Sequence, residues 1–301
     1  KDYSSVFGLE EDLLKNAKNE TDSSAVINKK IYPFYWRTNK DDLDVPKANP
    51  DNLYECKANS DEDKISNYLV SRYRSNPMVL YTRLLQLSSN PTLLLDKISN
   101  QIDETDEDFK DIEDDDISEM FDTLGIDHIE NSTKYNKAIE VSDNLLKDNK
   151  KIIIWCVFKD TMQKVWKDLR NKGYKVSQMS GDVDLNVREQ TIDDFKNGKI
   201  DAIVANPQTM AESVSLHTVC HDALYLEYTF NLTHMLQSRD RIHRLGLKYD
   251  DYTNYYYFLT TSNDSRYIDK KIYDRLFEKE ELMKKAIDGT ELQIDLSVNK
   301  K

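Results

Sequence analysis

The sequence predicts an α/β protein built on a doubly wound parallel sheet, preceded by a mainly helical, partly acidic connecting region. From Ser132 onward, short apolar runs alternate with amphipathic segments of helical length. The run KIIIWCVF, which ends at Phe158, is apolar almost throughout, as expected for a strand buried on both faces. Strands that alternate with helices form parallel sheets covered on both faces. Right-handed crossovers then make the sheet doubly wound.

Each element of this region has its own signature. Apolar residues recur at helical spacing from Tyr135 to Leu146 and again from Met162 to Leu169. Gly173 follows the second stripe, where a helix C-terminus favours glycine. The elements predicted beyond it are strand 174–178, helix 186–196, strands 200–205 and 223–227, helix 232–246, strand 254–260 and a helix from about 264 to 286.

The first 130 residues are expected to form a separate, mainly helical region, which gives predicted domains of 1–130 and 131–301. Apolar spacing within 61–95 indicates helices that stop at Asn90-Pro91. Aromatic residues in 31–47 are expected to cover a neighbouring domain. Ten acidic residues and one lysine lie within 103–116, and runs of this kind are usually solvated. We interpret this run as an insertion or linker, with mimicry of DNA as the alternative.

Composition narrows the function classes. Hydrophobic residues make up 39% of the chain and charged residues 32%, and no apolar run is long enough to cross a bilayer. The three cysteines form no CxxC pair, which predicts reduced thiols and a cytoplasmic or nucleoid-associated protein. A net charge of −13 argues against a broad nucleic-acid-binding surface but allows a narrow basic groove. His217 and His221 have no third ligand beside them, so no metal site is predicted.

The segment LTHMLQSRDRIHRLG, residues 232–246, carries the strongest functional signal. On a continuous helix, its apolar residues would lie on one side, with Gln237, Arg241 and Arg244 together on the opposite side. Two guanidinium groups one turn apart form a fork for an anion, since arginine donates bidentately and keeps its charge. A solvated basic face is the alternative interpretation.

The order Q-x-x-D-R-x-H-R-x-G is similar to the last motif of the Swi/Snf-type branch of superfamily-2 helicases, whose two arginines reach the γ-phosphate of ATP. The resemblance implies a second RecA-like lobe in which Arg241 and Arg244 act as arginine fingers. It also implies nucleotide contacts from Gln237, Glu212 and Ser213. DNA-backbone contacts are implied for residues in the loops after three predicted strands: Lys159, Ser180, Gly181, Arg188, Gln208 and Thr209.

Part of the sequence departs from the family pattern. The loop 205–216 lacks the serine-threonine start and the glycine pair of the family, so its contacts would come from side chains. The sequence contains no G-x-x-x-x-G-K-[ST] phosphate loop and no D-E-x-H motif, which phosphoryl transfer requires for a phosphate cradle and a metal site. We therefore expect a first RecA-like lobe outside this chain to bind most of the ATP and Mg²⁺, and this chain alone to be inactive.

The predicted function is therefore the second motor lobe of an ATP-dependent DNA translocase that contacts the DNA backbone without sequence preference. The alternative is a non-catalytic RecA-like module for protein interaction. Hydrolysis of ATP distinguishes the two interpretations.

Overall fold

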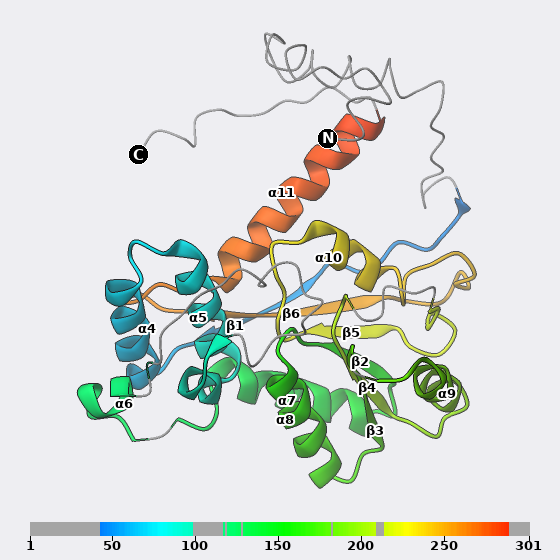
Figure 1. Cartoon of the computed structure of the whole chain (residues 1–301). Helices are drawn as coiled ribbons and strands as arrows, with labels where there is room; N and C mark the ends of the chain where they lie inside the picture. Colours follow the sequence, from blue (N-terminus) through cyan, green and yellow to red (C-terminus); the bar gives the residue numbers. More distant parts are fainter. Residues whose placement is uncertain are drawn as a thin grey trace, which may run out of the picture. The chain divides into compact units, whose positions relative to one another are not determined.

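A computed structural model describes residues 43–98, 117, 119–127, 129–181, 183–208 and 214–288 (Figure 1). The aromatic residues up to position 42 and the acidic run 103–116 lie outside this described part. The elements in chain order are β1 (Asn52–Lys57), α4 (Ser60–Arg72), α5 (Pro77–Ser89), η2 (Pro91–Leu95), α6 (Glu119–Leu124), α7 (Thr133–Lys147), β2 (Ile152–Trp155), α8 (Lys159–Asn171), β3 (Val176–Met179), α9 (Leu185–Lys196), β4 (Ala202–Ala205), β5 (Asp222–Tyr225), α10 (Leu232–Arg239), β6 (Asn254–Thr261) and α11 (Asp269–Asp288).

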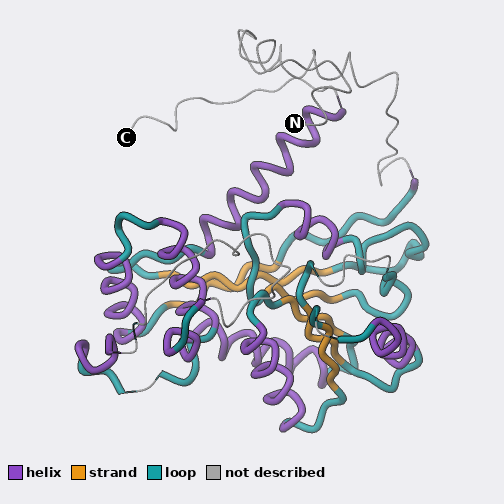
Figure 2. Tube along the Cα trace, in the orientation of Figure 1, coloured by secondary structure: helices purple, strands orange, loops and turns teal. Residues whose placement is uncertain are grey.

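Six strands form one sheet in the order β1-β6-β5-β2-β4-β3, and every neighbouring pair is parallel (Figure 2). The central strand β2 pairs with β4 on one side and β5 on the other, so Ile152 lies between Ala202 and Asp222. The chain therefore reverses its direction of winding at β2. This arrangement confirms the predicted doubly wound parallel sheet.

Helices cover both faces of the sheet. On one face, α7 and α8 pack against alternate strand residues such as Ile154 and Val204 in a continuous apolar core. The opposite set of strand residues meets α10, because the Tyr225 hydroxyl lies 2.8 Å from Ser238 Oγ. Burial of both faces explains why β2, β4 and β5 have no exposed residue.

The edge strand β1 was not predicted. Its residues alternate between partly exposed and exposed positions except for the buried Cys56, so the sequence shows no apolar run there. It joins the sheet by pairing with β6 over its whole length, from Asn52 opposite Tyr256 to Lys57 opposite Thr261. The predicted long helix also begins later than expected, at Asp269, whose carboxylate accepts the Thr260 amide at 2.9 Å.

Buried polar contacts join the start of α7 to α11 and to the helices between β1 and α7. Lys134 and Asp269 form a fully buried ion pair at 2.6 Å. Ser132 Oγ donates to the Ser88 carbonyl at 2.6 Å, and the Thr133 amide donates to the buried Glu62 at 2.9 Å. Residues Asp44–Tyr273 accordingly form one compact unit, which extends across the domain boundary predicted at residue 130.

A second unit comprises residues 1–43 and 274–301, of which the structure describes Leu43 and the later turns of α11. Within these turns, Arg275 and Glu278 pair at 2.7 Å on successive turns of the helix. Among the described helices, none combines the length and apolar character needed to span a membrane.

Candidate functional site

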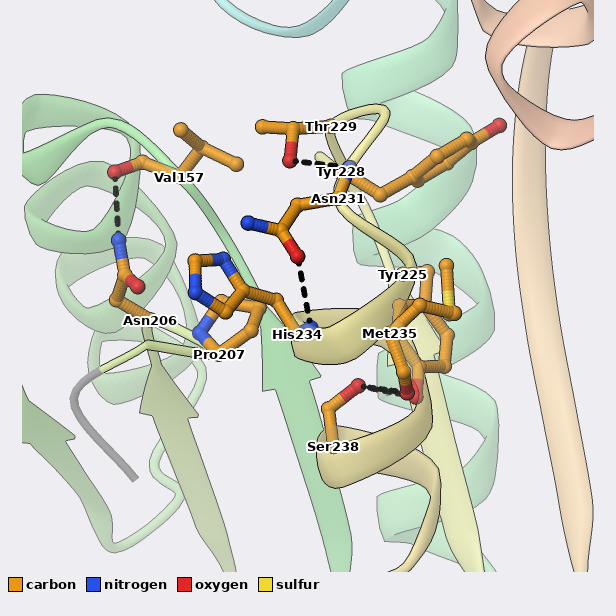
Figure 3. A pocket seen from close by; sticks show the side chains of 10 residues that line it. All are labelled: Val157, Asn206, Pro207, Tyr225, Tyr228, Thr229, Asn231, His234, Met235 and Ser238. Carbon is orange, nitrogen blue, oxygen red and sulfur yellow. Dashed lines mark hydrogen bonds between the residues drawn. The ribbon is translucent and has the colours of Figure 1, made fainter. Parts of the chain in front are cut away.

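A small pocket lies at the reversal point of the sheet, where the loops after β2, β4 and β5 meet α10 (Figure 3). Crevices at such reversal points are the usual ligand sites of open α/β sheets. The pocket encloses about 20 Å³, which is room for a water molecule rather than a nucleotide. Its lining residues are Val157, Asn206, Pro207, Tyr225, Tyr228, Thr229, Asn231, His234, Met235 and Ser238.

Side-chain amides hold the pocket loops in place. Asn206 donates from Nδ2 to the Val157 carbonyl at 3.1 Å, which ties the loop after β4 to the loop after β2. Its Oδ1 accepts the Gln208 amide at 2.8 Å. Asn231 caps α10 by accepting the His234 amide at 3.2 Å (Figure 3). The loop that departs most from the family pattern therefore begins with an asparagine that organises the strand ends.

Glu227 is a fully buried carboxylate that positions the same loop and that the sequence analysis did not identify. It accepts the amides of Val157 at 2.7 Å and Phe158 at 2.9 Å, and the Ser89 hydroxyl at 2.5 Å. Burial raises the pKa of Glu227 above its ordinary value, although these donors act in the opposite direction. These bonds satisfy amides at the start of α8, whose N-cap Phe158 has no capping side chain.

The structure corrects the predicted helix 232–246. α10 ends at Arg239, so Gln237 lies on the helix whereas Arg241 and Arg244 lie in the turns after it. Beyond Arg239 the helical pattern is lost: the Arg241 amide donates to the Ser238 carbonyl at 3.3 Å, and the Arg241 carbonyl accepts the amide of Leu216 at 2.9 Å. The prediction that one helix face presents all three side chains is therefore wrong. α10 begins at the capping Asn231 and runs back along the strands (Figure 3). Arg241 and Arg244 come after its C-terminal end, which is the end farther from Asn231.

The two arginines differ in their surroundings. Arg241 is 7% exposed, and its Nη1 donates to the Val214 carbonyl at 3.2 Å. Arg244 is exposed, and no hydrogen bond or ion pair engages its guanidinium within the described part of the chain. Burial and then the charge of Arg244 lower the pKa of Arg241. The turn therefore holds one guanidinium in place and leaves its neighbour accessible to an anion.

His217 packs against this arginine turn. A Cβ placed on Gly246 would lie 2.8 Å from His217 Nε2, and Gly246 itself has φ +109°, which disfavours other residues. Burial, followed by Arg244, lowers the pKa of His217. His217 Nδ1 lies 3.3 Å from Ser215 Oγ. The chain before β5 and the turn after α10 are thus in close contact, and Arg244 is the charge with the largest effect on His217 there.

Arg239 is a partly buried arginine of the same segment, and its role was not predicted. Its guanidinium forms two 3.2 Å hydrogen bonds with Asp51, donates to the Tyr257 hydroxyl at 3.0 Å and stacks 4.0 Å above the Tyr255 ring. No local signal identifies this role, because Asp51 lies 188 residues away in the sequence. His243, in the turn after α10, has its Nε2 2.7 Å from the Pro46 carbonyl oxygen.

The residues implied to contact nucleic acid lie in separate loops. Lys159 is the first residue of α8 and is half-buried. Ser180 and Gly181 form the turn after β3. Arg188 donates to the Gly181 carbonyl at 2.7 Å and the Val183 carbonyl at 2.8 Å, so its guanidinium braces that turn.

The loop after β4 is only partly described. Gln208 is half-buried beside Asn206, whereas Thr209, Glu212 and Ser213 lie outside the described residues. The roles implied for these three residues stay predictions. Among the described side chains, no group of three or more His, Cys, Asp and Glu residues is placed to bind a metal ion.

Comparison with known proteins identifies the central region. Residues 134–246 match the family described as Helicase conserved C-terminal domain. The chain is 30% identical over 100 residues to an ATP-dependent RNA helicase DBP3 of Candida glabrata and 29% identical over 100 residues to that of Saccharomyces cerevisiae. These matches cover 33% of this chain in both cases, and 17% and 18% of the two relatives.

The fold also matches a solved structure described as the C-terminal part of the Fun30 ATPase domain. The TM-score is 0.56 at 18% sequence identity, and the match covers 77% of this chain and 89% of the other. This similarity confirms the RecA-like fold. Residues 134–246 are accordingly similar to helicase C-terminal domains, on a RecA-like fold.

Proposed function

We propose that this helicase C-terminal domain is the second motor lobe of an ATP-dependent DNA translocase. Arg241 and Arg244 would act on a nucleotide bound mainly by a first RecA-like lobe. The observation that carries the proposal is the arginine turn after α10, in which Arg241 is held by the Val214 carbonyl and Arg244 is exposed. The bond of Arg241 to Val214 fixes the turn, and the exposed Arg244 guanidinium is placed to reach an external phosphate, as an arginine finger must.

The electrostatics of the turn support an anionic ligand. Arg244 lowers the pKa of both Arg241 and His217, after the effect of burial on each. A group whose pKa is lowered by neighbouring positive charge gains stability when an anion enters the same field. The charge that develops on a transferring phosphoryl group is an anion of this kind, and two guanidinium groups would stabilise it.

The described residues fit ATP only in part. The pocket at the strand ends is too small for a nucleotide, and the arginine turn follows the C-terminal end of α10. In our proposal the turn therefore meets the phosphates alone, and Gln237 lies beside it on the last turn of α10. The first lobe would supply the phosphate cradle and the Mg²⁺ ligands.

Nucleic-acid contacts are proposed for the loops after β2, β3 and β4. Lys159, Ser180 and Gln208 would contact backbone phosphates, while Arg188 would keep the Ser180 turn in shape through its two carbonyl contacts. The Swi/Snf-like motif favours DNA. The name of the DBP3 relatives, ATP-dependent RNA helicase, favours RNA as the second candidate.

The experiment joins this chain to its first lobe and measures ATP hydrolysis with duplex DNA, single-stranded DNA or RNA as the activator. Arg244→Ala and Arg241→Ala are each expected to lower the stimulated rate by about 10³-fold or more. Lys248→Ala, which removes an exposed cation four residues further on, serves as the matched control and should hydrolyse ATP at the wild-type rate.

The outcomes separate the candidates. A reduced rate with duplex DNA as the best activator supports the translocase, whereas the same reduction with RNA as the best activator supports an RNA helicase lobe. An unchanged rate in both arginine variants would exclude a motor role for the turn. The non-catalytic interaction module would then be the better description.

A further inference from the structure

A basic groove lies between α4 and the loop that joins β6 to α11. Figure 1 shows this loop beside α4 although the two are about 200 residues apart in the sequence. The groove measures about 610 Å³, within the roughly 300–1,000 Å³ of ligand sites. Its lining residues are Asn67, Val70, Ser71, Arg74, Asn263, Asp264, Ser265 and Arg266.

The two walls of the groove are fixed to each other. The fully buried Ser66 donates from Oγ to the Arg266 carbonyl at 2.6 Å. Ser265 Oγ donates to the Asp63 carbonyl at 3.1 Å, and the Tyr267 hydroxyl donates to the Asp63 carboxylate at 3.3 Å. The backbone positions of the groove therefore need no rearrangement before a ligand binds, which lowers the cost of binding.

The chemistry of the lining selects a phosphate ligand. Arg74 and Arg266 are exposed on opposite walls, and neither guanidinium forms an ion pair or hydrogen bond with the described residues. Among the described residues that line the groove, Asp264 is the single acidic one, so these residues carry a net positive charge in a chain whose net charge is −13. Arginine, serine and asparagine are side chains that commonly contact nucleic-acid phosphates.

The lining also indicates which part of a nucleic acid would bind. Val70 is the only apolar residue among the described residues that line the groove, and no aromatic ring lies among them. A base would therefore find no platform on which to stack. We propose that this groove is a separate binding site for the sugar–phosphate backbone of a nucleic acid, with Arg74 and Arg266 as its two phosphate-binding residues. This site does not depend on the role of the arginine turn.

The test measures binding of a fluorescent strand of about 20 nucleotides and of the matching duplex to the full chain, from low salt to roughly physiological salt and above. Substituting both arginines, R74Q/R266Q, should weaken binding on the order of tenfold at low salt. It should also reduce the slope of log K against log salt by about two, because each arginine neutralises one phosphate. Asp264→Asn should tighten binding several-fold, a change that damage to the fold would not produce.

The matched control is R170Q/K175Q, which removes the same charge from another groove that includes Gly173 and Tyr174. This control should leave the salt slope unchanged. The proposal would be overturned if R74Q/R266Q left the salt slope unchanged, or if the control pair reduced it equally. It would also be overturned if the wild-type chain bound neither the strand nor the duplex. ATP hydrolysis is not part of this readout, so the result is independent of Arg241 and Arg244.

Discussion

Replacing Glu227 tests whether a buried carboxylate organises the strand ends through hydrogen bonds rather than through its charge. Glu227→Ala would leave the amides of Val157 and Phe158 buried without an acceptor. Each orphaned amide costs about 1–3 kcal/mol, and truncation of the side chain leaves a cavity. We expect the free energy of unfolding to fall by about 3–5 kcal/mol.

Glu227→Gln should behave differently because it keeps an oxygen for both amides. Its new Nε2 can donate to Ser89 Oγ if the Ser89 hydroxyl turns its hydrogen from position 227 to the Leu85 carbonyl, which lies 2.9 Å away. We therefore expect the free energy of unfolding of this variant to lie within about 1 kcal/mol of wild type near pH 4.

The pH dependence of stability shows whether the fold favours the protonated or the ionised side chain of Glu227. Burial raises its pKa above the ordinary value of 4.5, so the native state holds this proton more tightly than the unfolded chain does. The stability that this group contributes is present below about pH 4.5 and declines as the pH rises through its native pKa. Because Glu227→Gln has no such proton, this variant should become more stable relative to wild type between about pH 4 and pH 7.

Urea denaturation followed by circular dichroism at several pH values across this range measures the difference directly. A variant that becomes less stable relative to wild type as the pH rises would refute the reasoning. That result would mean that the fold stabilises the ionised carboxylate. A decrease of less than about 1 kcal/mol in Glu227→Ala would equally exclude the proposed clamp.

Three further predictions concern buried or close contacts. Lys134→Met leaves the Asp269 carboxylate buried without its cation and should lower the free energy of unfolding by about 3–5 kcal/mol in the same denaturation assay. Gly246→Ala forces a side chain to φ +109° and against His217, and calorimetry should show a decrease of about 1–3 kcal/mol. Arg244→Ala should raise the pKa of His217, observed by NMR titration, because the charge of Arg244 lowers it in the wild type.

Each of these variants has a matched control. Lys64→Met removes an exposed lysine that pairs with Asp61 and should change stability by less than about 1 kcal/mol. Gly198→Ala introduces a side chain at φ +78° with no atom within 4 Å, so its cost isolates backbone strain from the His217 contact. Lys248→Ala should leave the pKa of His217 unchanged. Equal effects in variant and control would contradict the interaction that each variant removes.

The sequence predicts the central part of the fold well because burial there is local and periodic. The strand runs at β2, β4 and β5 are apolar on both faces, and the stripes of α7 and α8 have helical spacing. The edge strand β1 escapes this reasoning because half of it faces solvent, and its partner in the sheet, β6, lies about 200 residues later.

The site is predicted less completely because its contacts join residues that are far apart in the sequence. The apolar spacing up to Ile242 suggests a helix to residue 246, yet α10 ends at Arg239, and the Arg241 carbonyl bonds to the distant Leu216 amide. Arg239 and Glu227 owe their roles to partners that are distant in the sequence, Asp51 for the first and Ser89 for the second. A motif identifies which residue types meet a ligand, whereas the partners that fix them come from tertiary structure.

The pairing of β1 with β6 has a practical consequence for dissecting this protein. A fragment that began at residue 131 would leave one whole side of β6 open for pairing with other chains, a known route to aggregation. It would also strip Glu227 of its hydroxyl partner and Arg239 of its carboxylate. Soluble fragments of this lobe should therefore start before residue 44, and shorter ones should precipitate or self-associate.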